Sequence, residues 1–114
     1  MPPPRCLSRR IDVKLVATSF NVADKTIKLY TRLTNSDGRD IEVDTLYLDY
    51  LKLFAADGRP LFHGKNITLK IEPCLIPTGT YVENVVWLLR TNYVPVYDAP
   101  TISDWRGEIL CTVR

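Results

Sequence analysis

Apolar residues alternate with polar ones along most of this chain, and this period of two is what most constrains its fold. Ile11, Val13 and Leu15 fall on one face of a segment whose other face carries Asp12 and Lys14. Successive side chains of a β-strand point to opposite sides, so the pattern predicts a strand with one buried face. Similar patterns predict strands at 27–33, 41–54, 67–71, 80–90, 93–97 and 109–113.

Turn-forming residues separate these segments. The sequence NSDG at 35–38 combines short polar side chains with a glycine, and Asp57-Gly58 before Pro60 is a second turn. Within 45–54 the apolar phase slips, because Leu46 and Leu48 form one set while Leu51 and Leu53 form another. A β-bulge would reconcile the two sets. A short helix is the alternative, and the nearby Thr, Tyr and Val residues favour the strand.

Strands that recur at this spacing without a convincing helix predict an all-β fold, an antiparallel β-sandwich of immunoglobulin or cupredoxin type with about seven strands. With 114 residues, the chain is one domain's worth. We expect the sandwich to span 11–114, preceded by a flexible Pro/Arg-rich arm at 1–10. No apolar run approaches the roughly 20 residues that a membrane span needs.

The charge distribution argues against a nucleic-acid surface. Arg5, Arg9 and Arg10 stand in the arm without an acidic residue, which leaves 12 basic and 13 acidic residues in the rest of the chain. A protein that binds nucleic acid through its fold shows a basic stripe, and this body is nearly neutral. The three arginines remain a candidate contact for an acidic partner.

The residues needed for most catalytic sites are missing from the sequence. His63 is the single histidine and Met1 the single methionine, so a blue-copper site, which needs two histidines, is not expected. A Ser-His-Asp triad is not expected either, because His63 falls in a predicted turn and no serine stands in a nucleophile-elbow sequence. No phosphate-binding glycine pattern occurs, and Asp49 and Glu108 fall where a solvated strand face would place them. We therefore predict a non-catalytic protein with no cofactor and no metal ion.

Three cysteines give an odd count. Cys6, Cys74 and Cys111 include no CxxC pair, which disfavours zinc and thioredoxin-like sites. Cys111 fits a small buried hydrophobe. A Cys74–Cys111 disulfide is an alternative in an extracytoplasmic chain, with one thiol left over. The triplet Asn66-Ile67-Thr68 is a glycosylation sequon whose use depends on the compartment, which the sequence leaves open.

Aromatic residues exceed what a small core needs, so some of them are expected at a partner-binding surface. Trp87 is the expected core tryptophan. In the segment 93–97, Pro95 cannot donate a ladder hydrogen bond, which places this segment on a sheet edge, and Trp105 is expected in a loop. The predicted partner-binding residues are Tyr93, Val94, Tyr97, Trp105, Arg5, Arg9 and Arg10.

Four stretches also resemble the C-terminal cupredoxin-like domain of the B subunit of copper membrane monooxygenases, which oxidise methane or ammonia. They are TNSDG at 34–38, IPTGT at 76–80 with Trp87 after it, the strand at 41–54, and WRGEIL at 105–110. Thr78 and Thr80 depart from the family's proline and acidic residue. The family's copper ligands lie in another domain, so the resemblance implies a metal-free packing domain of a larger complex.

Two functions of different classes follow from these features. The first is a structural or interaction subunit that binds a protein partner through an edge strand, exposed aromatics and the arginine arm. The alternative is a carbohydrate-binding module, which requires Trp105 and two tyrosines to share one open face.

Overall fold

The computed structural model describes residues 5–6, 11–21, 23–90 and 102–113, and every regular element in these ranges is a β-strand. Six strands have ten residues or more, and a seventh has two. Their bounds are β1 (Arg5–Cys6), β2 (Ile11–Asn21), β3 (Thr26–Asn35), β4 (Ile41–Phe54), β5 (Pro60–Ile76), β6 (Tyr81–Arg90) and β7 (Ile102–Val113). The predicted all-β class is thus confirmed for the described residues, which include no helix able to cross a membrane.

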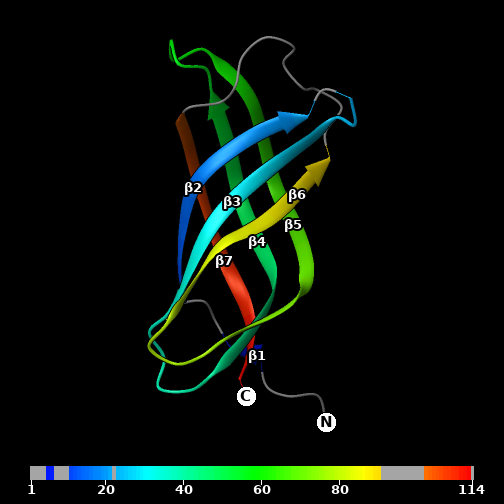
Figure 1. Ribbon diagram of the computed structural model, residues 1–114. Coiled ribbons are helices and arrows are strands. Elements are labelled where there is room, and N and C mark those ends of the chain that lie inside the picture. Colours follow the sequence, from blue (N-terminus) through cyan, green and yellow to red (C-terminus); the bar gives the residue numbers. More distant parts are fainter. Residues whose placement is uncertain (1–4, 7–10, 22, 91–101, 114) are drawn as a thin grey trace.

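The strands form two antiparallel sheets packed in a sandwich-like arrangement. One sheet has the order β1-β7-β4-β5 and the other the order β2-β3-β6. Figure 1 shows the second sheet, coloured blue, cyan and yellow, lying across the green, orange and red strands of the first. Consecutive strands β2 and β3, and β4 and β5, are hairpin partners, whereas the chain crosses between sheets after β1, β3, β5 and β6.

The core lies between the sheets and follows the predicted alternation. Ile27, Leu29 and Leu33 of β3 are buried, and Trp87 of β6 is fully buried. The indole Nε1 of Trp87 donates a hydrogen bond to Thr31 Oγ1 at 2.8 Å, and that hydroxyl donates to the carbonyl of Val85 at 3.0 Å. Because a buried N–H without a partner is costly, this short relay is what lets a tryptophan occupy the core.

The phase slip at 45–54 is part of one continuous strand. In β4 the register shifts between Val43 and Thr45 and again between Leu48 and Tyr50, so Leu46, Leu48, Leu51 and Leu53 are all buried. The strand interpretation is confirmed and the short helix is wrong. Each irregularity re-aims the side chains that follow it.

The bounds of β5 and β7 differ from the prediction. The predicted strands at 67–71 and 80–90 left Pro73 to Gly79 as a connection, but β5 continues to Ile76. Pro73 is tolerated there because β5 is an edge strand, where an N–H is not required. We expected Trp105 in a loop, but it lies within β7, which begins at Ile102. The proposed edge strand at 93–97 lies outside the described residues.

The strand predicted at 80–90 is β6, but its facing residues differ from the simple alternation. Asn84 adopts a left-handed conformation with φ of 60° at a register shift relative to β3. This extra residue turns Val82 towards the core and leaves Tyr81 59% exposed. In the described residues β6 pairs with β3 alone, so it is an edge strand and not a central one.

Part of the predicted N-terminal arm belongs to the fold. Arg5 and Cys6 form β1, which pairs with Thr112 and Cys111 near the end of β7. The other residues of the arm, Arg9 and Arg10 among them, lie outside the described residues.

The close approach of β4 and β7 requires a glycine at position 107. A Cβ atom there would lie 2.2 Å from the backbone oxygen of Tyr47, and this oxygen cannot move without disturbing the ladder.

We expect Gly107→Ala to lower the free energy of unfolding by about 3 kcal/mol, measured by urea denaturation. Gly38→Ala is the matched control, because a Cβ atom at position 38 would meet no atom within 4 Å and a change of about 0.5 kcal/mol or less is expected. Equal stabilities of the two variants would contradict the argument.

Candidate interaction surface

The outer face of the three-stranded sheet carries large apolar side chains of β6 that are exposed. Tyr81 is 59% and Leu88 56% exposed, and Val86 between them is half-buried. We call these three residues the β6 surface. They face away from the core because residues 85, 87 and 89 of the same strand are buried inward.

Neighbouring strands extend the β6 surface. The register places Tyr30 of β3 opposite Val86, and Ala17 of β2 opposite Tyr30. Val16 precedes Ala17 and is 59% exposed, because a register shift between Leu15 and Ala17 leaves Val16 out of the alternation. An apolar band therefore crosses all three strands of this sheet.

Charged side chains flank the band at both ends. Near Tyr81, the guanidinium of Arg32 lies 5.2 Å from the ring centroid and pairs with the carboxylate of Glu83. At the other end, Lys28 is the cross-strand neighbour of Leu88, and the exposed Arg90 follows two residues later. One end of the band thus carries a cation paired with an anion and the other carries two cations, so the Leu88 end is the more basic.

The four-stranded sheet carries a polar hollow on its outer face. It has a volume of about 360 Å³. Its lining residues are Tyr47, Leu48, Asp49, Asn66, Thr68 and Glu108. Tyr47 is 41% exposed, and its register partners Thr68 and Glu108 stand on either side of it.

Two further polar contacts join β4 to β7, and Asp49 of the first also lines this hollow. Arg106 Nε lies 3.4 Å from Asp49 Oδ2. Tyr50 donates a hydrogen bond to Asp104 Oδ1 at 3.2 Å. Partial burial raises the pKa of Tyr50, and that hydrogen bond raises it further. The hollow thus combines one aromatic ring with carboxylate, amide and hydroxyl groups, which are groups able to bind polyhydroxylated molecules.

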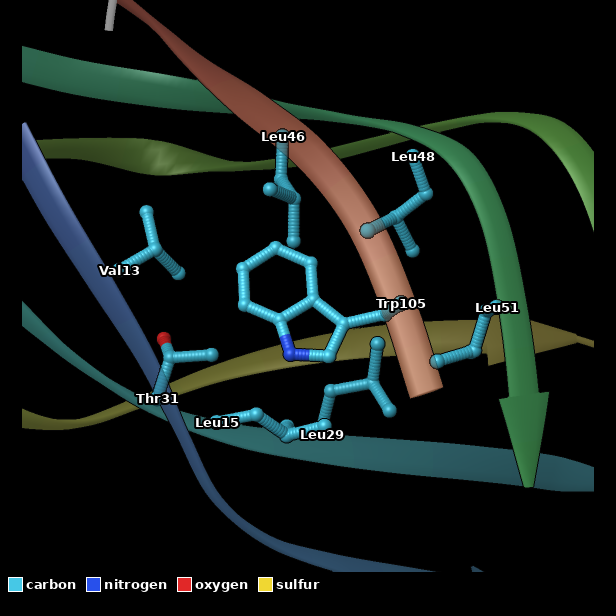
Figure 2. Close-up of a pocket in the computed structure, with 8 residues that line it drawn as sticks. All are labelled: Val13, Leu15, Leu29, Thr31, Leu46, Leu48, Leu51 and Trp105. Carbon is cyan, nitrogen blue, oxygen red and sulfur yellow. The ribbon is translucent and has the colours of Figure 1, made fainter. Parts of the chain in front are cut away.

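Trp105 faces the interior. Figure 2 shows its indole ring pointing from β7 into an apolar pocket between the sheets. Leucines at 15, 29, 46, 48 and 51 line this pocket together with Val13 and Thr31, and its volume is only about 10 Å³. A cavity of that size is filled by at most about one water molecule, so it holds no ligand. Trp105 therefore does not share an open face with tyrosines, which the carbohydrate hypothesis required of it.

Of the other predicted contact residues, Tyr93, Val94 and Tyr97 lie outside the described part of the chain. Arg5 lies in β1 at the opposite end of the strand order from β5. His63 is exposed on β5 opposite Lys52 and does not line the hollow. Within the described ranges, no group of three or more His, Cys, Asp or Glu residues is placed to hold a metal ion.

The sequence contained a signal for Val86 and Leu88 but not for Val16. Residues 80–90 are apolar on both faces, and in the sequence this pattern predicts either a central strand or an interface. Val16 interrupts a regular alternation, and a register shift of that kind is visible only once the neighbouring strand is in place.

Comparisons with known proteins returned no match: no family model matches the chain, and neither does a curated protein or a solved structure.

Proposed function

We propose that this chain is a non-catalytic interaction subunit that binds a protein partner along β6. The observation that carries the proposal is an edge strand whose outward face is apolar. A partner in extended conformation would pair with the free edge through main-chain hydrogen bonds and place its side chains on the β6 surface.

Among the three long edge strands, β2, β5 and β6, the last two differ in how they resist such pairing. β5 contains Pro60 and Pro73 and carries the exposed Lys65 and Lys70, which are features that discourage a second chain from pairing. From Val85 to Leu89, β6 has neither proline nor charge. An apolar, β-favouring edge of this kind is a template for another strand.

The charges beside Leu88 favour a particular partner chemistry. Lys28 and Arg90 flank this side chain, so a partner strand that sets an apolar residue on Leu88 gains from a carboxylate next to it. We therefore propose an extended partner segment in which an acidic residue stands two positions from an apolar one, so that both side chains lie on the same face as Leu88.

We also propose that the sandwich has an immunoglobulin-like topology. The order β2-β3-β6 corresponds to strands A, B and E of that fold, and β7-β4-β5 corresponds to F, C and C′. The resemblance to the monooxygenase B-subunit domain rests on sequence segments that include 34–38 and 76–80, and these two segments lie together here because Asn35 bonds the backbone of both Ile76 and Thr80. That likeness would make this chain a metal-free packing subunit.

Leu88→Asp tests the proposed surface. We expect it to weaken partner binding roughly tenfold or more, because a buried Leu contact of about 1.5–3 kcal/mol is replaced by a charge that must be desolvated. The measurement is affinity capture of the intact chain from its native source, with quantification of every retained protein. Removal of residues 1–10 in parallel measures what the arginine arm adds.

The matched control is Leu75→Asp. Leu75 is 51% exposed on β5, in the other sheet, so the same chemical change is made away from β6. Both variants should keep the thermal midpoint of the wild type. A partner that is retained equally by both variants, or lost equally from both, would contradict binding along β6.

The polar hollow supports carbohydrate binding as a second candidate function. Tyr47 offers a ring for stacking on a sugar, and Asp49, Asn66 and Glu108 offer hydrogen bonds to hydroxyl groups. This version of the hypothesis uses Tyr47 in place of Trp105.

Tyr47→Ala separates the two candidates. With a panel of plant, bacterial and animal oligosaccharides, we expect NMR amide shifts confined to 47–49, 66–68 and 108, and an affinity reduced roughly tenfold in the variant. Tyr50→Ala, on the same face but outside the hollow, should bind like the wild type. The absence of shifts for every sugar would exclude this candidate and leave the β6 proposal untouched.

A further inference from the structure

β1 places one cysteine directly opposite another. Cys6 is one of the two described residues of this strand, and its register partner in β7 is Cys111. Directly opposed residues of an antiparallel pair have Cα atoms about 4.5–5.5 Å apart. A disulfide requires a Cα separation of about 4.4–6.8 Å, so the backbone register alone satisfies the requirement.

The third cysteine is excluded from this pairing by the sheet order. Cys74 and Cys111 are both register partners of Val43, on opposite sides of β4. Two strand spacings separate them by about 9.5 Å, beyond the limit of about 7 Å for a disulfide. The Cys74–Cys111 pairing considered from the sequence is therefore wrong for this fold.

Cys74 is also poorly suited to react. It is free and half-buried, and this burial raises the pKa of its thiol. Since the thiolate is the attacking species, a raised pKa leaves less of it at neutral pH. The odd cysteine of the three is thus Cys74.

The shortness of β1 supplies a second reason for a covalent link. Two residues form few ladder hydrogen bonds, and ordering each residue costs roughly 1–2 kcal/mol of backbone entropy. We propose that Cys6 and Cys111 form a disulfide that fastens β1 to β7 when the protein meets a small-molecule disulfide oxidant.

The reaction is two successive thiol–disulfide exchanges. The thiolate of Cys6 or Cys111 attacks oxidised glutathione, forms a mixed disulfide and releases one glutathione thiolate. The second protein thiolate then attacks the protein sulfur of that mixed disulfide and releases the second glutathione. In sum, two protein thiols are oxidised to one disulfide and one glutathione disulfide is reduced to two thiols.

Tryptic mass spectrometry distinguishes all pairings, because cleavage after Arg and Lys puts each cysteine on its own peptide. Cys6 falls on 6–9, Cys74 on 71–90 and Cys111 on 107–114. After treatment of the full chain with oxidised glutathione and alkylation without reductant, we expect 6–9 joined to 107–114 in the monomer band. A link that involves 71–90, a link found only in dimers, or glutathione adducts without a link would overturn the proposal.

Two variants make the test specific. Cys6→Ser should abolish the link, whereas Cys74→Ser should leave it unchanged. The thermal midpoint is the second measurement, made on the Cys74→Ser protein in its oxidised and reduced forms. Closure of a loop on the order of 100 residues should raise the midpoint by roughly 10 °C. A link that leaves the midpoint unchanged or lowers it would show that it does not hold the native β1–β7 pair, and would equally overturn the proposal.

Discussion

The two sheets depend on one buried amide at the end of the sandwich. Asn35 is 1% exposed, and its Nδ2 donates to the carbonyls of Ile76 and Arg39 at 2.8 and 3.0 Å. Its Oδ1 accepts from the backbone N–H of Asp37 at 2.8 Å, and its own backbone bonds Thr80 and Gly79. An unpaired buried polar group costs about 1–3 kcal/mol, so these bonds hold the β3–β4 and β5–β6 connections against each other. Both connections carry the chain from one sheet to the other, and the alignment of the sheets follows from them.

That alignment determines which side of β6 meets the core. With Thr80 held by Asn35, β6 starts beside the end of β3, and the bulge at Asn84 brings Val85, Trp87 and Leu89 inward. The hydroxyl of Thr31 then lies within reach of the Trp87 indole. Because the inward positions are fully used, the apolar residues left over on this strand must face outward. The β6 surface is therefore a consequence of packing on the other face, combined with a sequence that is apolar on both faces.

Alternation and turn residues were enough to predict the all-β class, the core positions of β2 and β3, and a continuous β4. They failed where the chain departs from a period of two. Asn84 and Val16 each displace the alternation by one residue, and a single strand read alone does not reveal how its neighbour will absorb the shift. Trp105 was expected in a loop, whereas Gly107 permits β7 to approach β4 closely and the indole of Trp105 lines the apolar pocket between the sheets. The predicted partner residues at 93–97 lie outside the described residues, so that part of the site remains a prediction.

The edges of the two sheets differ in how well they are protected against pairing with another chain, and this difference connects the structure to the proposed role. β5 contains prolines and exposed lysines, β2 carries the exposed charges of Asp12 and Lys14, and β1 covers the end of β7 at its register with Thr112 and Cys111. In the described residues nothing equivalent stands beside β6. An unguarded apolar edge is an aggregation hazard unless a partner occupies it, so its presence next to guarded edges argues for binding. A disulfide between β1 and β7 would increase this difference, because it closes the β1 edge of the four-stranded sheet covalently and leaves the β6 edge for pairing with a partner.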